Sequence, residues 1–249
     1  MPADELTAPD DGDDGDEARI PDDALTILAT AEITLEGRMP WSSNATFLAN
    51  LGDTGAQAIY KPVRGERPLW DFEPGLHKRE AAAYRLSEAM GFGVVPPTVL
   101  RDDAPLGAGS LQWFVAADHR EHYFTIAEQR PDLHPQLRDI AVLDVVANNT
   151  DRKSGHCLLA GERVWAIDNG LCFAPDFKLR TVIWEFAGDP LTPAQLASVS
   201  RICGGVPSEV ADLLAPVEVE AIRGRARWLA EHGVLPGDES GGRYPWPLV

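Results

Sequence analysis

Two aspartates near the middle of the chain have the residue type and the spacing that chemistry requires. Asp151 precedes a short apolar run at 157–159, and Asp168 directly follows a second apolar run at 164–167. Gly161 separates the two runs, so the stretch predicts a β-hairpin that holds both carboxylates at one rim of a cleft. That arrangement suits phosphoryl transfer, in which one acid handles the acceptor hydroxyl and the other holds a metal ion on the phosphates.

The same stretch resembles the catalytic core of the protein-kinase-like fold, nearest to phosphatidylinositol 3- and 4-kinases and to HipA-type kinases. In those families an Asp-bearing loop precedes a hairpin that ends in Ile-Asp-x-Gly. The matching residues here are Asn149-Thr150-Asp151-Arg152 and Ile167-Asp168-Asn169-Gly170. The chain is also similar, over about residues 30–235, to an actinobacterial group of phosphatidylinositol-kinase-like proteins. The resemblance implies a two-lobed α+β fold with a β-rich N-lobe and a helical C-lobe.

This resemblance implies roles for the residues of the loop and hairpin. Asp151 would steer or accept the proton of the acceptor hydroxyl, and Asp168 would hold the divalent metal. The family has a metal-binding Asn five positions after the loop Asp, where this chain has His156. Arg152 and Lys153 would either neutralise charge on the transferring phosphoryl group or face solvent. The alternative for the two acids is a solvated turn at Asp151 and a strand-end cap at Asp168.

The N-terminal part of the chain supplies the residues that the resemblance assigns to the nucleotide. Strands are predicted at 31–37 and 45–49, and neither a kinase glycine loop nor a Walker A motif lies between them. The turn instead offers Ser42, Ser43 and Asn44 to phosphate oxygens, or is an ordinary polar turn.

A Lys and a Glu complete the set that the resemblance assigns. A third strand at 56–62 carries Lys61, which would bridge the nucleotide phosphates or simply be solvated. Glu80, on a helix predicted at 76–90, would orient Lys61 or remain an unpartnered surface charge.

Hydrophobic periodicity predicts the remaining elements. An edge strand is expected at 92–100 because Pro96 and Pro97 exclude a central one, and a further strand at 111–115 leads to a hinge near 116–120. Amphipathic or capped helices are expected at 132–147, 192–203, 208–214 and 217–232. The predicted domains are an acidic disordered tail at 1–23, an N-lobe at 24–118, a C-lobe at 119–235 and a C-terminal tail at 236–249.

The amino-acid composition argues against some classes of binding partner. The 249 residues carry a net charge of −17, and residues 1–23 contribute ten acids against one Arg. This balance disfavours nucleic acid and stable membrane association, because both recruit basic patches. The three cysteines lack a C-x-x-C spacing, which favours reduced thiols. No signal peptide is apparent, so a cytoplasmic protein is expected.

The predicted function is therefore an atypical kinase that uses ATP or GTP with Mn²⁺ or Mg²⁺. The acceptor is expected to be soluble: a protein Ser or Thr hydroxyl, in this chain or another, or a small molecule. Two alternatives remain: a pseudokinase that binds nucleotide without turnover, which His156 motivates, and a purely structural interaction protein.

Overall fold

A five-stranded antiparallel sheet forms the first part of the structure. The computed structural model describes residues 20–39, 44–67, 69, 72 and 74–248. The strand order in the sheet is β1-β2-β3-β5-β4. The strands are β1 (Ile33–Arg38), β2 (Phe47–Leu51), β3 (Gln57–Pro62), β4 (Thr98–Arg101) and β5 (Gly109–Trp113). Helix α1 (Ala24–Thr30) packs on β4 and β5.

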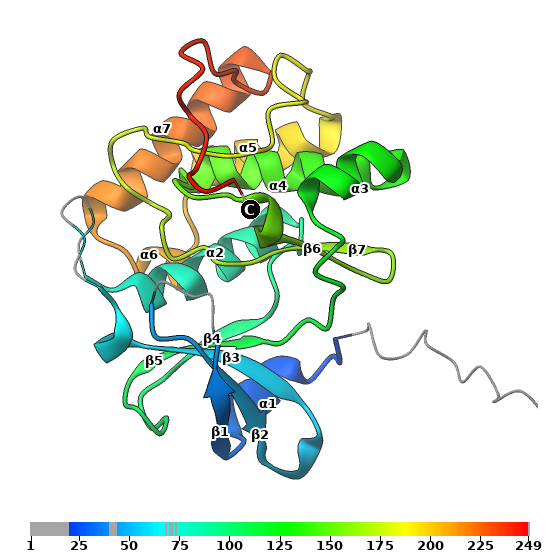
Figure 1. Ribbon diagram of the computed structural model, residues 1–249. Helices are drawn as coiled ribbons and strands as arrows, with labels where there is room; N and C mark the ends of the chain where they lie inside the picture. The colour runs from blue at the N-terminus through cyan, green and yellow to red at the C-terminus, as the bar shows by residue number, and fades with distance from the viewer. Residues whose placement is uncertain (1–19, 40–43, 68, 70–71, 73, 249) are drawn as a thin grey trace, which may run out of the picture.

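The second part of the structure is mostly helical, and in Figure 1 it lies above the sheet. Its helices are α3 (Tyr123–Gln129), α4 (His134–Ala147), α5 (Pro193–Gly204), α6 (Ser208–Ala211) and α7 (Pro216–His232). A two-stranded hairpin of β6 (Cys157–Ala160) and β7 (Arg163–Ala166) packs on α3 and α4. None of the helices in the described ranges is long and apolar enough to cross a membrane.

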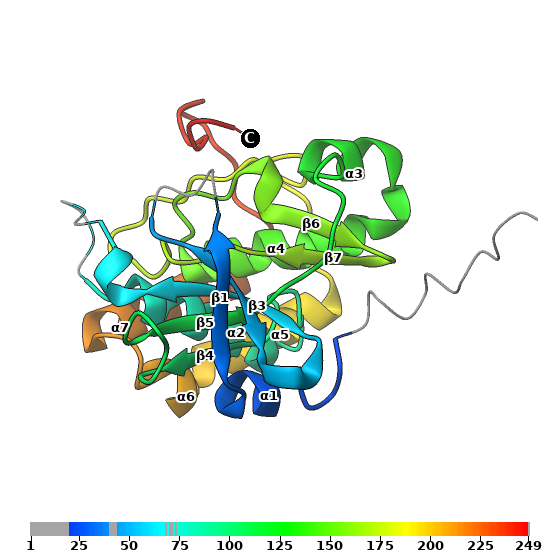
Figure 2. The same ribbon diagram turned by 60° about the horizontal axis from the view of Figure 1, so that its bottom comes forward.

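Helix α2 (Leu76–Met90) connects the two parts. It contacts β4 and β5 of the sheet and also α4, α5 and α6. Figure 2, which looks from the sheet side, shows α2 behind the strands and next to the helices. The fold is therefore α+β and protein-kinase-like, with the sheet-rich part first and the helical part second.

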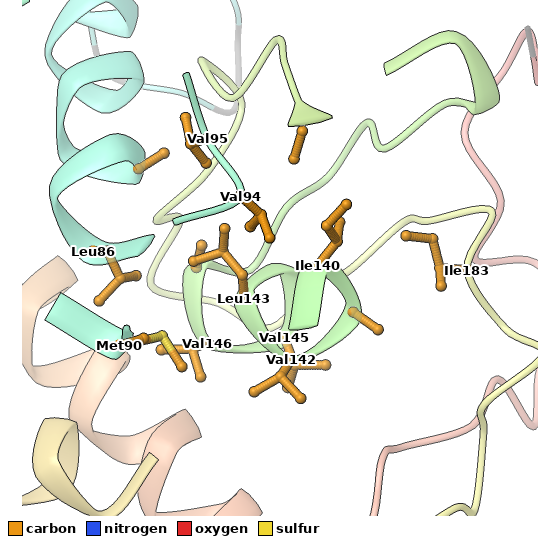
Figure 3. Close-up of a cluster of buried hydrophobic side chains, with 14 of the residues drawn as sticks. Leu86, Met90, Val94, Val95, Ile140, Val142, Leu143, Val145, Val146 and Ile183 are labelled. Carbon is orange, nitrogen blue, oxygen red and sulfur yellow. The ribbon is translucent and has the colours of Figure 1, made fainter. Parts of the chain in front are cut away.

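Two apolar cores hold these parts together. The smaller one lies between α1 and the face of the sheet on which α1 packs, and it includes Leu28, Leu51 and Tyr60. The larger one surrounds α4. Figure 3 shows Val142, Val145 and Val146 of α4 among the side chains of this cluster, with Leu86 and Met90 from α2 beside them. Because α4 is buried along most of its length, its packing holds the first residue of the following loop in one position.

Most expected elements occur close to their predicted bounds. The helix at 76–90 is confirmed without shift, and the hairpin turns at Gly161, which has a φ of 58° that favours glycine. The edge strand is confirmed, although β4 starts only after Pro97. The helix α3 was not predicted from the sequence. The 1–23 tail lies almost entirely outside the described residues.

Candidate active site

Lys61 lies on the face of β3 that points away from the smaller core. Successive side chains of a strand alternate between its two faces, and its neighbour Tyr60 is fully buried in that core. The ammonium of Lys61 makes ion pairs with two acids, Glu80 from α2 and Asp168 from the end of the hairpin, with a distance of 2.8 Å to Asp168 Oδ1. Glu80 is only 3% exposed, so it is not a surface charge.

Asp168 stands on a backbone conformation that few residues adopt. Its φ is 56°, in the left-handed region that non-glycine residues enter at some cost and mainly at functional sites. The carboxylate is about half exposed, although Lys61 and His156 both approach it. The nearby Lys61 ammonium holds the pKa of Asp168 well below its usual range. Burial opposes the charge of Lys61, but Asp168 and Glu80 still raise the pKa of Lys61 above its ordinary value.

His156 presents one ring nitrogen to the same carboxylate. Its Nε2 lies 3.4 Å from Asp168 Oδ2, and its Nδ1 lies 2.9 Å from the carbonyl oxygen of Asp151. A carbonyl accepts but does not donate, so the shorter contact favours the tautomer with the proton on Nδ1 and the lone pair on Nε2, while the backbone N–H of Lys153 approaches Nδ1 at the longer distance of 3.4 Å. Burial lowers the pKa of His156 to about 4, so the ring is neutral at pH 7. This tautomer is the one that a metal-binding histidine needs.

Asp151 begins the loop that leads into the hairpin. Its backbone N–H donates to Asn149 Oδ1 at 2.9 Å, and its carboxylate lies 3.3 Å from Lys153 Nζ. Partial burial raises the pKa of Asp151, and Lys153 counteracts that rise. A carboxylate whose pKa is raised toward neutrality is a better proton acceptor than an exposed one. The sequence predicts two basic side chains here, Arg152 and Lys153. Lys153 forms an ion pair with Asp151 and does not simply face solvent.

Arg152 corrects both sequence-based expectations for that residue, because it neither faces solvent nor can reach a phosphoryl group. Its side chain is completely buried, and its guanidinium forms a bidentate pair with Asp144 of α4, at 3.0 Å from Nε and 2.9 Å from Nη2. The remaining donors reach Asn169 Oδ1 at 2.6 Å and the carbonyl of Ile167 at 2.7 Å. Arg152 thus fastens the loop to α4 and to the end of the hairpin.

The buried network continues from Arg152 to Lys61. The backbone N–H of Asn169 donates to Glu80 Oε2 at 2.9 Å, while Glu80 Oε1 binds the Lys61 ammonium. Gly170 follows, and a Cβ there would lie 3.2 Å from Glu80 Oε1, which is closer than most Cβ contacts. One series of contacts therefore runs from Asp144 through Arg152 and Asn169 to Glu80, and it fixes the positions of Asp151 and Asp168.

A narrow cleft contains the two acids and the lysine together. Its volume is about 60 Å³. The lining includes Asn44, Lys61, Glu80, Asp151 and Asp168, so the structure brings together five of the residues predicted from the sequence. Asn44 also accepts a hydrogen bond from the backbone N–H of Arg67 at 3.0 Å. Ser42 and Ser43 lie outside the described residues.

Two titratable residues of the cleft, Glu66 and His77, were not predicted from the sequence. Glu66, in the loop after β3, accepts from the backbone N–H groups of Gly75 at 3.1 Å and His77 at 2.9 Å, so it caps the N-terminus of α2. The His77 ring lies 2.8 Å from the same carboxylate. Burial works against ionisation, yet these hydrogen bonds lower the pKa of Glu66 to about 2. Glu66 is not adjacent to the start of α2 in the sequence, so no local capping pattern could have identified it.

The C-terminal segment, for which the sequence indicated no role, packs against the loop between α4 and the hairpin. The carbonyl of Leu248 accepts from Ser154 N at 2.9 Å, and the carbonyl of Arg243 accepts from Thr181 N at 3.2 Å. The loop itself pairs with the following segment, since Arg152 N donates to the Arg180 carbonyl at 3.1 Å. The C-terminal segment is thus bonded both to the loop that contains Asp151 and to the segment with which that loop pairs.

Replacing Lys61 by Met is expected to weaken nucleotide-supported turnover. A charge-assisted hydrogen bond to phosphate is worth about 1.5–3 kcal/mol, so the KM for nucleotide should rise about 10- to 100-fold. Steady-state kinetics at varied nucleotide concentration measure this. Lys78→Met, at an exposed position of the same region in α2, is the control and should leave the KM unchanged. Equal KM values in all three proteins would contradict the assignment.

Comparison of the sequence with known proteins identified relatives of this chain. No family model matches it. It is 37% identical over 266 residues to protein Rv2133c of Mycobacterium tuberculosis (strain ATCC 25618 / H37Rv), covering 91% of this chain and 95% of the relative. It is also 26% identical over 204 residues to phosphatidylinositol 4-kinase gamma 4 of Oryza sativa subsp. japonica, which covers 65% of this chain but 35% of the plant protein.

Solved structures agree on the fold. The Golgi casein kinase with Mn/ADP bound superposes with a TM-score of 0.54 at 15% identity, covering 92% of this chain and 80% of that one. Hydra Fam20 with sugar gives a TM-score of 0.54 at 13% identity, covering 84% and 86%. At these identities the likeness concerns the fold alone. On the 37% identity that extends over nearly the whole of both proteins, the chain belongs to the family of protein Rv2133c.

Proposed function

We propose that this protein is an atypical kinase that transfers the γ-phosphate of ATP or GTP to a hydroxyl group. The observation that supports it most is the Lys61 ammonium, which lies between Glu80 and Asp168 in a cleft that also contains Asp151. A lysine held by an acid on a helix, with two further acids opposite, is the set that phosphoryl transfer uses. The kinase-like fold of the Golgi casein kinase agrees with it.

Each side chain then has one task. Lys61 binds the phosphates of the nucleotide, and Glu80 keeps the ammonium in place. Asp151 accepts the proton of the acceptor hydroxyl, or orients that hydroxyl, as its oxygen attacks the γ-phosphorus and the bond to the β–γ bridging oxygen breaks. The backbone and side chain of Asn44 contact phosphate from the loop between β1 and β2. Ser42 and Ser43 belong to the same loop in the sequence.

Asp168 and His156 fit a divalent cation. Their facing atoms, Oδ2 and Nε2, are 3.4 Å apart, and protein ligands lie about 2.0–2.2 Å from such an ion, so both can reach one cation. The described residues contain no group of three or more His, Cys, Asp or Glu around a common point, which leaves further positions to phosphate oxygens and water. When bound, the cation neutralises charge that develops on the phosphates.

The nitrogen ligand leads to a prediction about metal preference. Mg²⁺ prefers oxygen ligands in near-ideal octahedral geometry, whereas Mn²⁺ accepts imidazole nitrogen more readily. We expect Mn²⁺ to support turnover better than Mg²⁺, and His156→Asn to shift the ratio of the two rates toward Mg²⁺ by about threefold or more. Rates measured with each metal at saturating nucleotide test this. Identical metal profiles for the wild type and the variant would show that His156 does not bind the metal.

The acceptor is proposed to be soluble rather than a lipid, although a plant phosphatidylinositol 4-kinase is among the relatives. An anionic headgroup on an anionic membrane calls for clustered Lys and Arg beside the cleft. Between residues 174 and 190 the sequence has only Lys178 and Arg180 as basic residues, against three acids. The chain as a whole carries −17.

Incubation with labelled nucleotide distinguishes the two acceptor classes. We expect no label in lipid when phosphoinositide vesicles are present, and label on protein or on a small polyol in their absence. The vesicle reaction should be run at low and physiological salt, because electrostatic membrane binding weakens with salt. Label in extracted lipid with none on protein would overturn the assignment of the acceptor.

The second candidate is a nucleotide-binding pseudokinase, which the His156 substitution favours. In that case nucleotide and metal would bind with the same dependence on Lys61, but the γ-phosphate would not be transferred. Binding measured by calorimetry and turnover measured on the same preparation separate the two candidates.

A further inference from the structure

His77, at the start of α2, is a residue of the cleft that has no role in the reaction described so far. Glu80 follows it three positions later in the helix, so the two side chains lie on the same face of α2. The cleft that contains Lys61, Asp151 and Asp168 is also lined by His77. The imidazole therefore borders the space in which the proposed transfer takes place.

The ring of His77 is oriented by Glu66, which comes from the loop after β3. Its Nδ1 lies 2.8 Å from Glu66 Oε1, and the backbone N–H of His77 donates to the same oxygen at 2.9 Å. Burial opposes ionisation of Glu66, but these hydrogen bonds lower its pKa to about 2, so the carboxylate is charged at pH 7. A charged carboxylate only accepts hydrogen bonds, so Nδ1 carries a proton.

The second ring nitrogen of His77 is open to a ligand. In the described part of the chain Nε2 makes no hydrogen bond or ion pair, and it is not among the buried polar atoms that lack a partner. It is therefore accessible to solvent, although the side chain as a whole is only 12% exposed. Such a nitrogen accepts a hydrogen bond when the ring is neutral and donates one when the ring is protonated.

The charges around the cleft favour donation to an anion. Besides His77, the charged residues of the described lining are four acids and one lysine: Glu66, Glu80, Asp151, Asp168 and Lys61. The lysine already pairs with two of those acids. Arg67 and Lys78 adjoin the Glu66–His77 pair along the chain, but both are exposed and neither lines the cleft. A phosphoryl group in this cleft therefore needs positive charge beyond that of Lys61, and a protonated imidazole supplies it.

We propose that the protonated ring of His77 donates from Nε2 to an oxygen of the transferring phosphoryl group, with Glu66 as the residue that orients the ring. This role rests on the proposed kinase function. The arriving phosphate brings the negative charge that favours a proton on Nε2, and that proton comes from the buffer. The contact is specific for the terminal phosphate, because that group approaches Asp151 in the narrow cleft that His77 also lines.

Calorimetry on the full chain with Mn²⁺ tests the contact. The probes are ADP, GDP and the imido analogues of ATP and GTP, in which an NH group replaces the β–γ bridging oxygen so that no transfer occurs. We expect His77→Ala to bind the triphosphate analogue at least about tenfold more weakly than the wild type, with unchanged affinity for the diphosphate. His232→Ala, at an exposed position of α7, is the matched control and should bind both as the wild type does.

Proton uptake gives a second readout that a merely structural role would not change. Titrations at mildly alkaline pH, in buffers that differ in ionisation enthalpy, count the protons taken up with the triphosphate analogue. We expect the wild type to take up more protons than His77→Ala. Glu66→Gln should resemble His77→Ala in this respect, because its amide oxygen still caps α2 but carries no charge. Thermal unfolding checks that each variant is folded.

The outcomes separate this role from the kinase assignment. Equal affinity of the wild type and a folded His77→Ala protein for the triphosphate analogue would refute the role of His77 and leave the kinase assignment standing. An equal loss of affinity for the diphosphate would also refute the contact with the terminal phosphate. Failure of the wild type to bind any of the nucleotides with Mn²⁺ would overturn both.

Discussion

Replacing Asp168 by Asn is expected to lower the rate of phosphate transfer by about 10³-fold or more, because the charge that holds the metal and pairs with Lys61 is lost. The side chain is half exposed, and the variant keeps its shape, so the fold should persist. Turnover per folded protein, with near-UV circular dichroism to check packing, measures the effect. Asp151→Asn should also abolish transfer, since an amide cannot take the acceptor proton.

The control for this prediction is Asp176→Asn. Asp176 is an exposed acid of the segment after the hairpin, and its replacement changes the net charge by the same amount. Its turnover should equal that of the wild type. A rate within a few-fold of wild type for either Asp168→Asn or Asp151→Asn would remove that residue from the mechanism.

Replacing Arg152 by Met is expected to reduce the free energy of unfolding by about 3–5 kcal/mol, because Asp144 is left as a buried charge without its cation. Asp144 is 1% exposed, and Arg152 is fully buried. The midpoint of denaturant unfolding, with the slope compared between variants, reports this change. Arg223→Met is the control. It breaks a pair with Glu220 whose side chains are 38% and 61% exposed, so it should cost less than about 1 kcal/mol.

A double variant separates the charge from the packing. In Arg152→Met with Asp144→Leu no charge remains buried, so much of the lost stability should return. Turnover should stay low in the double variant, since Arg152 also orients Asn169 and the Ile167 carbonyl next to Asp168. If Arg152→Met unfolded at the same denaturant concentration as the wild type, the buried network would not hold the loop.

Sequence patterns predicted the elements whose stability is local. The α2 helix has a run of good helix formers that ends at Gly91, whose φ of 74° suits a helix end, so both of its bounds could be predicted. The short α3 helix lacks such signals. Two of its seven residues, Tyr123 and Ile126, are fully buried, so tertiary packing rather than propensity holds it.

The candidate site was predictable in its residue types but not in its connections. Asp151 and Asp168 were grouped by their spacing around the predicted hairpin, whereas Lys61 and Glu80 come from distant parts of the sequence and only the resemblance placed them beside the two acids. The burial of Arg152 could not be predicted, because an Arg beside a catalytic acid has the same local pattern whether it meets phosphate, solvent or a buried Asp. Only the position of α4 shows that Asp144 is its partner.

The fate of the γ-phosphate shows whether this cleft moves a phosphoryl group. The protein is incubated with γ-labelled ATP or GTP and Mn²⁺, and label is summed over protein, small molecules and inorganic phosphate, so the acceptor need not be known. We expect metal-dependent loss of label from the nucleotide in the wild type and at least about 10³-fold less in Asp168→Asn. Nucleotide that binds with Mn²⁺ yet keeps its label, at the same level in both proteins, would contradict it.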